Sequence, residues 1–291
     1  MAATAVEVQV EGRRLRLSNL EKVLYPEVGF TKGQVIDYYT RAAPWLLPHL
    51  RGRALTLKRY PDGVEAGHFY EKQKPSHAPE WVRSEAIQAG DRVIDFVLCD
   101  DLPTLIWLAN LADLELHPSL ALAADPDRPT VVAFDLDPGS PAGLPECLEV
   151  AVLLRDLLAQ LSLDCWPKTS GSKGMQVYIP LNTDVGYDDT KPFAQAVAKL
   201  LQARHGKLIT SVMSKRERPG KVFIDWSQND RHKTTVGTLS LRARERPTVS
   251  CPLTWDEVES GAVDTLALDT PAVLKRLAES GDPFAPVLER R

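Results

Sequence analysis

Three aspartates at the ends of two apolar segments could together hold divalent metal ions. Asp135 and Asp137 lie in VVAFDLDPG (131–139), and Asp225 lies in KVFIDW (221–226). Both segments are rich in Val, Ile and Phe and are closed by turn residues, which is typical of buried strands. Because alternate side chains of a strand share a face, Asp135 and Asp137 should project together. A buried carboxylate must be paired or bind a metal, so the three acids predict a two-metal site of the kind that catalyses phosphoryl transfer.

The D-x-D pattern also occurs in other enzymes. Haloacid-dehalogenase-type phosphatases use the first Asp as a nucleophile, and many glycosyltransferases use D-x-D to hold a metal. In the phosphatases a Thr or Val normally follows two places after the second Asp, whereas this chain has Gly139 there. A phosphohydrolase with Asp135 as nucleophile therefore stays open as an alternative at this point.

A Gly-rich turn, KTSGSKG (168–174), is the second candidate element. Its glycines allow the backbone to approach an oxyanion, and the hydroxyls of Ser170 and Ser172 can donate to phosphate oxygens. Lys173 supplies a positive charge for the outer phosphates. The spacing is not that of a Walker A loop, because no G-K-[ST] follows.

Further polar residues follow Asp225. The segment WSQN (226–229) comes directly after the strand, and SLRAR (240–244) lies downstream. Arginines in such a position can clamp triphosphate oxygens. Ordinary surface charge is the alternative interpretation.

Strands and helices that would position these residues are interleaved along the chain, which indicates an α+β or mixed α/β class with one sheet carrying the acids. Ser18-Asn19 and Thr31 are predicted to cap helices, and Pro192 to lie in the first turn of another. The predicted helices are 32–47, 101–112, 145–161 and 192–204, and the predicted strands include 54–60, 131–139, 166–169, 175–181, 208–212, 221–226 and 238–241.

The chain has 291 residues, enough for one large domain or two modest ones. The stretch 123–129 is the best candidate boundary, so we predict a single domain over 1–291 with an N-terminal module of about 1–125 and a catalytic module of about 126–291. Net charge is −4, but 204–246 contains eleven Lys or Arg and only four Asp or Glu. A basic region on an acidic body is typical of a protein that binds a polyanion.

The four cysteines are widely spaced and have no metal-site spacing, so we expect reduced core residues. No signal-peptide core and no membrane-spanning apolar run are present, which predicts a soluble cytoplasmic protein without a membrane partner.

The combination FDLDPG, TSGSKG, FIDWSQN and SLRAR resembles the polymerase domain of bacterial ligase D, a member of the archaeo-eukaryotic primase superfamily. NLEKVLYPEVGFTKGQVIDYY, FYEKQKPSHAP and LELHP extend the resemblance over nearly the whole chain. It implies an α+β primase-polymerase fold, with a mixed or antiparallel RRM-like catalytic sheet flanked by helices and an N-terminal α/β module. The implied activity is template-dependent nucleotide addition, preferring ribonucleotides, at DNA gaps, overhangs and ends in non-homologous end-joining repair.

The resemblance also implies roles for individual residues. Asp135, Asp137 and Asp225 would be catalytic ligands of two Mn²⁺ or Mg²⁺ ions. Contacts to the NTP or dNTP would come from Lys58, His117, Ser170, Ser172, Lys173, Gln228 and Arg244. The 5′-phosphate of a gap would meet Asn19, Lys22 and Lys32, and the template would stack on Phe69 and Tyr70. Ku and a DNA ligase are implied as possible partners, with a place at DNA breaks in the bacterial nucleoid.

Two positions depart from the family pattern. The family has a histidine two residues after SKG, where this chain has Gln176, and the second template aromatic is Tyr70. Glutamine can still donate a hydrogen bond but cannot carry positive charge. A non-catalytic module that binds and bridges DNA ends is the remaining alternative function.

Overall fold

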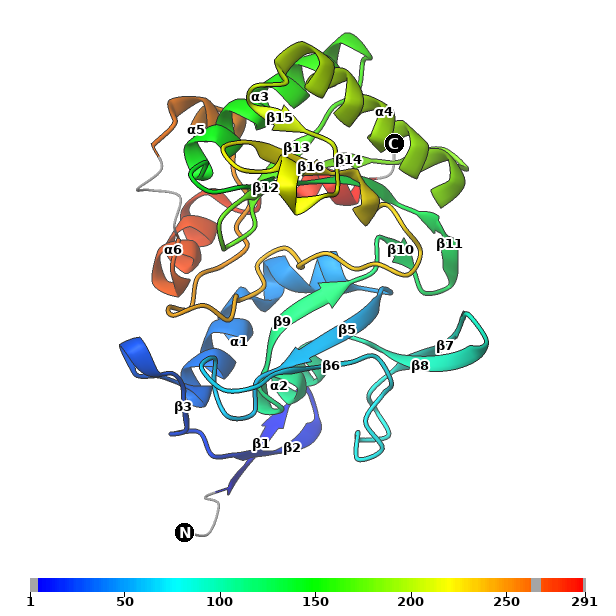
Figure 1. Cartoon of the computed structure of the whole chain (residues 1–291). Helices are drawn as coiled ribbons and strands as arrows, with labels where there is room; N and C mark the ends of the chain where they lie inside the picture. The colour runs from blue at the N-terminus through cyan, green and yellow to red at the C-terminus, as the bar shows by residue number, and fades with distance from the viewer. Residues whose placement is uncertain (1–4, 263–267, 290–291) are drawn as a thin grey trace. The chain divides into compact units, whose positions relative to one another are not determined.

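The computed structural model describes residues 5–262 and 268–289, which form two compact units. Of the described residues, unit 1 contains 5–119, 236–249 and 269–281, and unit 2 contains 120–235, 250–262, 268 and 282–289. Both units mix helices and sheets, as the predicted α+β class requires (Figure 1). The division into modules of about 1–125 and 126–291 stays a prediction, and the two units differ from it because late segments of the chain belong to unit 1.

Unit 1 is built around a five-stranded antiparallel sheet. Strand β5 (Ala54–Arg59) pairs with β6 (Phe69–Glu71), β8 (Arg92–Leu98) and β9 (Asp113–Pro118), and β7 (Ser84–Ala89) pairs with β8. Two helices of this unit, α1 (Lys32–Leu50) and α2 (Leu102–Asn110), contact each other. The other elements of unit 1 are β1 (Ala5–Val10), β2 (Arg13–Ser18), β3 (Val23–Tyr25), η1 (Pro26–Val28), β4 (Phe30–Thr31) and α6 (Thr270–Ser280).

Unit 2 carries the sheet that holds the aspartates. Its strand order is β13-β14-β12-β16-β15, antiparallel except for the β15–β16 pair. The strands are β12 (Val131–Pro138), β13 (Trp166–Thr169), β14 (Met175–Pro180), β15 (Ile209–Thr210) and β16 (Val222–Asp225). The other elements are β10 (Ala121–Leu122), β11 (Asp125–Pro129), α3 (Leu144–Gln160), α4 (Tyr187–His205), η2 (Lys215–Glu217), η3 (Trp226–Gln228), α5 (Trp255–Ser260) and η5 (Ala285–Leu288).

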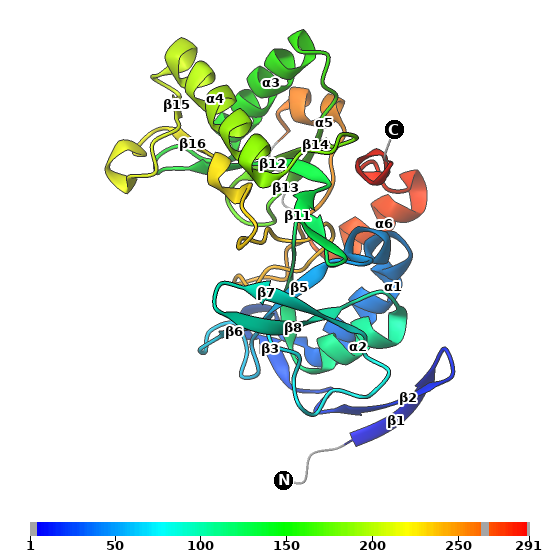
Figure 2. The ribbon, with the colours of Figure 1, turned by 90° about the vertical axis from the view of Figure 1, so that its right-hand side faces the viewer.

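The two faces of the unit 2 sheet differ in chemistry. Helices α3 and α4 cover one face, as both ribbon views show (Figures 1 and 2). Val132, Phe134 and Leu136 of β12 pack there, in an apolar core that also includes alternate residues of β14 and β16. Because neighbours on a strand point to opposite faces, Asp135 and Asp137 belong to the other face. The apolar core therefore fixes the direction in which the acids project.

Most predicted elements are confirmed, but two helix starts are wrong. Thr31 caps α1 through a capping box with Gln34. No helix follows Ser18-Asn19, because Asn19 adopts φ +54° in a turn that leads into β3. Helix α4 starts at Tyr187 instead of Pro192, behind Gly186 and with two acids in its first turn.

The predicted strand 238–241 is also absent; Leu241 makes only an isolated bridge with Val249. All four cysteines are buried and free, as the sequence predicts. Within 5–262 and 268–289, none of the helices is long and apolar enough to cross a bilayer.

Candidate active site

A row of polar side chains crosses the unit 2 sheet from β13 to β16. Lys168 lies opposite Gln176, Gln176 opposite Asp135, and Asp135 opposite Asp225. Residues directly opposite each other on paired strands have side chains on the same face. The register therefore brings two of the three predicted metal ligands together from strands ninety residues apart in sequence, and Asp137 is two residues along from Asp135.

Each carboxylate of this row is turned toward a protein partner. Asp135 accepts a hydrogen bond from Gln176 (Nε2–Oδ1 3.1 Å), and Asp225 accepts one from Gln228 (Nε2–Oδ2 2.7 Å) as well as bonds from Ser227. Asp137 is half-exposed and lies 3.8 Å from the Arg218 guanidinium. Among the residues that the structure describes, no three His, Cys, Asp or Glu side chains are arranged to hold an ion. The backbone register places the acids together, whereas the side chains are engaged by other donors.

The electrostatics of the row nevertheless fit a cation. Burial raises the pKa of Asp135 to about 7, and the negative charges of Asp137 and Asp225 add to the rise. Gln176 and Lys168 oppose the rise without overcoming it. Three carboxylate oxygens of this kind are the donor set that Mg²⁺ and Mn²⁺ prefer. An ion that displaced the present partners would relieve the repulsion among the acids.

The Gly-rich turn between β13 and β14 is organised by Ser170. Its buried Oγ accepts from the backbone N–H groups of Ser172 and Gly174, each at 3.2 Å. Ser172 and Lys173, at the tip of the turn, are exposed. Two of the predicted phosphate contacts, Ser172 and Lys173, are therefore exposed to solvent. The third, Ser170, stabilises the turn that carries them.

Two glycines allow neighbouring segments to approach the end of β12 closely. A Cβ on Gly174 would lie 2.0 Å from the backbone oxygen of Leu136, between the two aspartates of β12. A Cβ on Gly139 would lie 2.1 Å from the backbone oxygen of Arg218. Such distances cannot be met without backbone movement, so only glycine fits either place as the strands stand.

In unit 1, Lys58 and His117 are brought together by the β5–β9 pair. Both side chains contact Glu115, at 3.2 Å and 3.0 Å respectively, and both are mostly buried. Burial lowers the pKa of His117, although Glu115 acts in the opposite direction. Arg244 is exposed on the segment 236–249, which also belongs to unit 1.

The sequence model of the LigD primase-polymerase domain matches residues 31–284. The chain belongs to this family. A relative from Mycolicibacterium smegmatis, the multifunctional non-homologous end joining protein LigD, is 41% identical over 94% of the chain. A bifunctional non-homologous end joining protein LigD from Bacillus subtilis is 33% identical over 93% of it. The chain spans 36% and 44% of those relatives' lengths.

The fold agrees with the family. The solved polymerase domain from Mycobacterium tuberculosis ligase D, in complex with DNA, superposes with a TM-score of 0.89 and 38% identity over 94% of this chain and 98% of that one. The primase-polymerase fold predicted from the motifs is therefore confirmed. Primase-polymerase domains are nucleotidyltransferases, and that activity uses a nucleoside triphosphate and a divalent metal ion. The phosphohydrolase alternative has no support from the family.

The three residues predicted to bind a 5′-phosphate are near one another in this primase-polymerase domain. Lys32 is the first residue of α1, and its backbone N–H donates to the carbonyl of Lys22 at 2.9 Å. The N–H of Lys22 in turn donates to the carbonyl of Asn19 at 3.0 Å. Their ammonium groups have protein partners: buried Lys32 donates from Nζ to the carbonyl of Asn110 at 3.0 Å, and Lys22 Nζ pairs with Asp62 at 2.7 Å. The 5′-phosphate role of the three residues stays a prediction.

The predicted template aromatics point to opposite sides of β6. Tyr70 lies opposite Lys58 and Phe69 opposite Arg59 in the β5–β6 register. Tyr70 is close to His117, with ring centroids 6.2 Å apart, and Lys58 Nζ is 5.6 Å from the Tyr70 ring. Phe69 lies instead under the Arg59 guanidinium. Both rings are exposed, and template stacking stays a prediction for each of them.

Four residues close to the predicted sites were given no role of their own in the sequence analysis, although Lys168 and Asn229 lie in segments named there. Buried Lys168 donates to Ser250 at 2.7 Å and lies 5.5 Å from the Tyr178 ring. Asn229, also buried, bonds to both backbone groups of Ala133. A charged residue inside a strand, such as Lys168 in β13 or Glu115 in β9, is a signal that could have found two of them. The four residues are Glu115, Lys168, Arg218 and Asn229.

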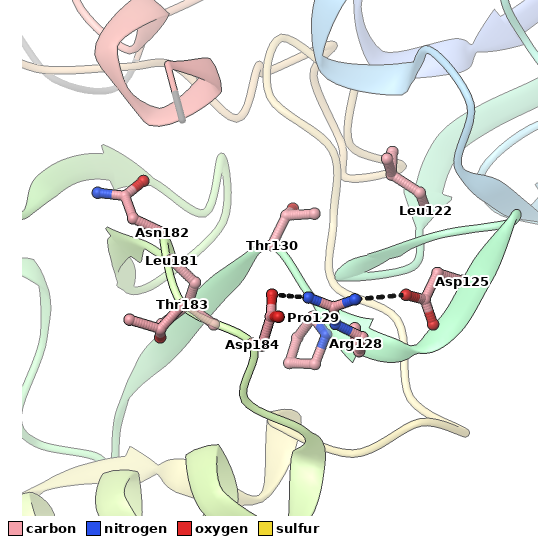
Figure 3. A pocket seen from close by; sticks show the side chains of 9 residues that line it. All are labelled: Leu122, Asp125, Arg128, Pro129, Thr130, Leu181, Asn182, Thr183 and Asp184. Carbon is pink, nitrogen blue, oxygen red and sulfur yellow. Dashed lines mark hydrogen bonds and ion pairs between the residues drawn. The ribbon is translucent and has the colours of Figure 1, made fainter. Parts of the chain in front are cut away.

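A cavity of about 170 Å³ lies at the other end of β12, where the strand begins (Figure 3). It is lined by Arg128, which pairs with Asp125 and Asp184, and by the segment that follows β14. None of the predicted site residues lines it. The cavity therefore does not contribute to the aspartate site.

Proposed function

We propose that this chain is a template-dependent nucleotidyltransferase that adds nucleotides, preferably ribonucleotides, to DNA ends and gaps in non-homologous end joining. The observation that carries the proposal is the cross-strand pair of Asp135 and Asp225, with the Gly-rich turn lying close to the same strand end at Gly174. A pair of acids beside a phosphate-binding turn is the arrangement that nucleotide transfer requires. The relatives' end-joining names and the DNA complex of the solved neighbour support the substrate.

In the proposed reaction the 3′-hydroxyl of a primer strand attacks the α-phosphate of a nucleoside triphosphate. Asp135, Asp137 and Asp225 would hold two divalent ions, Mn²⁺ or Mg²⁺, after releasing Gln176, Arg218 and Gln228. When bound, such ions favour ionisation of the attacking hydroxyl and stabilise the leaving oxygen of pyrophosphate.

The remaining predicted contacts orient the substrates. Ser172 and Lys173 would donate to triphosphate oxygens, with Ser170 holding the turn and Gln228 beside Asp225. Lys58, His117 and Arg244 are likewise proposed as contacts to the nucleotide. The basic stretch 204–246 would neutralise DNA phosphates, so DNA binding should weaken steeply with salt.

A labelled gapped duplex incubated with NTPs or dNTPs and each ion in turn tests the function directly. We expect addition of nucleotides complementary to the template, more efficiently with NTPs. DNA binding without any addition under either ion would leave only the end-bridging alternative.

We further propose that the protein acts at chromosome breaks in the bacterial cytoplasm, together with Ku and a DNA ligase.

Recognition of a 5′-phosphate should depend on pH. Burial and the neighbouring charge of Lys22 lower the pKa of Lys32 to about 8. As pH rises through this value the free protein loses the Lys32 proton, so binding a phosphate requires proton uptake and affinity falls, approaching tenfold per pH unit. The preference for gaps with a 5′-phosphate over gaps with a 5′-hydroxyl, measured by titration at several pH values, should therefore decrease between pH 7 and pH 9.

The double variant Lys22→Gln/Lys32→Met should lose that preference at every pH. Lys72→Gln, at an exposed lysine of the same unit, serves as the matched control and should keep it. An equal loss of affinity for both kinds of gap in the double variant would contradict the 5′-phosphate assignment.

A further inference from the structure

A single buried carboxylate joins three segments of unit 1. Glu115 of β9 is 1% exposed. Its Oε2 lies 3.2 Å from Lys58 Nζ on β5 and 3.0 Å from His117 Nε2. Its Oε1 accepts from the backbone N–H of Ala243 at 3.1 Å and lies 3.5 Å from Arg242 Nε, an ion pair too long for a good hydrogen bond.

The charge balance shows that Glu115 is held as an anion. Burial alone would raise the pKa of Glu115, but the hydrogen bond from His117 and the charges of Arg242, His117 and Lys58 hold that pKa well below its usual range. A buried charge is tolerated only when such partners surround it. Removing this carboxylate charge would leave two cationic side chains, Lys58 and Arg242, close together without the carboxylate that they share.

The partners of Glu115 include or adjoin every nucleotide contact predicted in unit 1. Lys58 and His117 are themselves such contacts. Arg244 directly follows Ala243, whose N–H is bound to Glu115, and the Arg244 N–H donates to the carbonyl of Arg242 at 3.0 Å. The turn that carries Arg244 is therefore fixed to β9 by the same carboxylate.

We propose that Glu115 is a positioning residue that sets Lys58, His117 and the 242–244 turn for binding the nucleoside triphosphate. The proposal rests on the proposed function, because it assumes that these residues contact the nucleotide. The bond from His117 Nε2 to Glu115 also fixes the ring tautomer. The proton resides on Nε2, and Nδ1 is left as an acceptor. Glu115 itself need not touch the nucleotide.

The substitution Glu115→Gln keeps the shape of the side chain and removes its charge. We expect the KM for the nucleoside triphosphate to rise roughly tenfold or more, with a smaller change in kcat, because misplaced contacts weaken substrate binding. The Mn²⁺ concentration for half-maximal activity should stay unchanged. Glu115→Asp, which keeps the charge but shortens the reach, should recover part of the loss.

The matched control is Glu71→Gln. Glu71 of β6 pairs with Arg59 of β5 at 2.7 Å and is not itself a predicted nucleotide contact. This variant should keep the wild-type KM. A folded Glu115→Gln variant with wild-type KM would overturn the proposal. If the wild type itself added no nucleotide, the proposed function would fail instead.

The proposal can also be tested on the wild-type protein, by NMR of His117, if the variants do not fold. The ¹⁵N shifts of the histidine ring nitrogens should show His117 protonated on Nε2 and not on Nδ1 near pH 8. Protonation on Nδ1 alone would overturn the proposal without any substitution.

Discussion

Replacing Asp135 with Asn should reduce nucleotide addition about a thousandfold, because the ions it would help to hold contribute several kcal/mol and each 1.36 kcal/mol is a factor of ten in rate. Binding of gapped DNA should persist, since the substitution leaves the basic stretch and the 5′-phosphate residues intact. Primer extension under single-turnover conditions, with binding measured in parallel, separates the two effects. Nearly normal extension by Asp135→Asn would remove the metal site as the centre of the mechanism.

The same variant should be more stable than the wild type when no metal is present. The pKa of Asp135 is raised to about 7 in the folded protein, above its unfolded value, so the folded state holds the proton more tightly. Ionisation therefore costs stability, and the cost grows as pH rises from about 4 to about 7. Above pH 7 we expect Asp135→Asn to gain up to about 4 kcal/mol in the free energy of unfolding, because the pKa rise of about three units costs about 1.36 kcal/mol per unit.

Thermal unfolding without metal at pH 5 and pH 8 tests whether Asp135→Asn is more stable than the wild type. The advantage of Asp135→Asn should be larger at pH 8. Added Mn²⁺ should raise the Tm of the wild type and raise that of the variant much less. Asp164→Asn, at an exposed carboxylate of the same unit, is the control and should match the wild type in all these measurements. A lower Tm for Asp135→Asn at both pH values would contradict the repulsion among the acids.

Gly174→Ala should also impair catalysis severely, although Gly174 carries no chemistry. Its new Cβ would lie 2.0 Å from the Leu136 oxygen and 3.2 Å from Cδ of Pro138, so β14 and β12 must separate where Asp135 and Asp137 project. A displacement of about 1 Å in a catalytic group can reduce the rate about a hundredfold. We expect a loss of about that size in kcat, together with a lower Tm.

Gly67→Ala provides the control for Gly174→Ala. A Cβ on Gly67 would meet nothing within 4 Å, and this residue does not have the positive φ that disfavours alanine. Activity and Tm of this variant should equal those of the wild type. Wild-type activity of Gly174→Ala would show that the turn tolerates a shift away from the strand.

Local patterns accounted for the elements that depend only on neighbours in sequence. The apolar content of 131–139 predicted β12, and side-chain alternation predicted the shared face of its two acids. Thr31 caps α1 as predicted, and the structure adds Gln34 as its partner in a capping box. The predicted start of α4 at Pro192 was wrong. Proline is common in a first helical turn, but the helix begins earlier, after Gly186 and with two acids in its first turn. The helix predicted after Ser18-Asn19 was also wrong. Asn is common at helix N-caps, but it also tolerates the left-handed conformation that Asn19 adopts here.

The sequence by itself determined the family, the α+β class and the acidic strands, because motifs, hydrophobic periodicity and side-chain alternation are properties of short segments. The tertiary structure decided that Asp225 faces Asp135, that Gln176 and Lys168 extend the same row, and that Glu115 joins three segments. It also decided that Tyr70 lies opposite Lys58 and Phe69 opposite Arg59 in the β5–β6 pair. Strand register and buried ion pairs depend on contacts between segments far apart in the chain, and a single sequence does not specify those pairings.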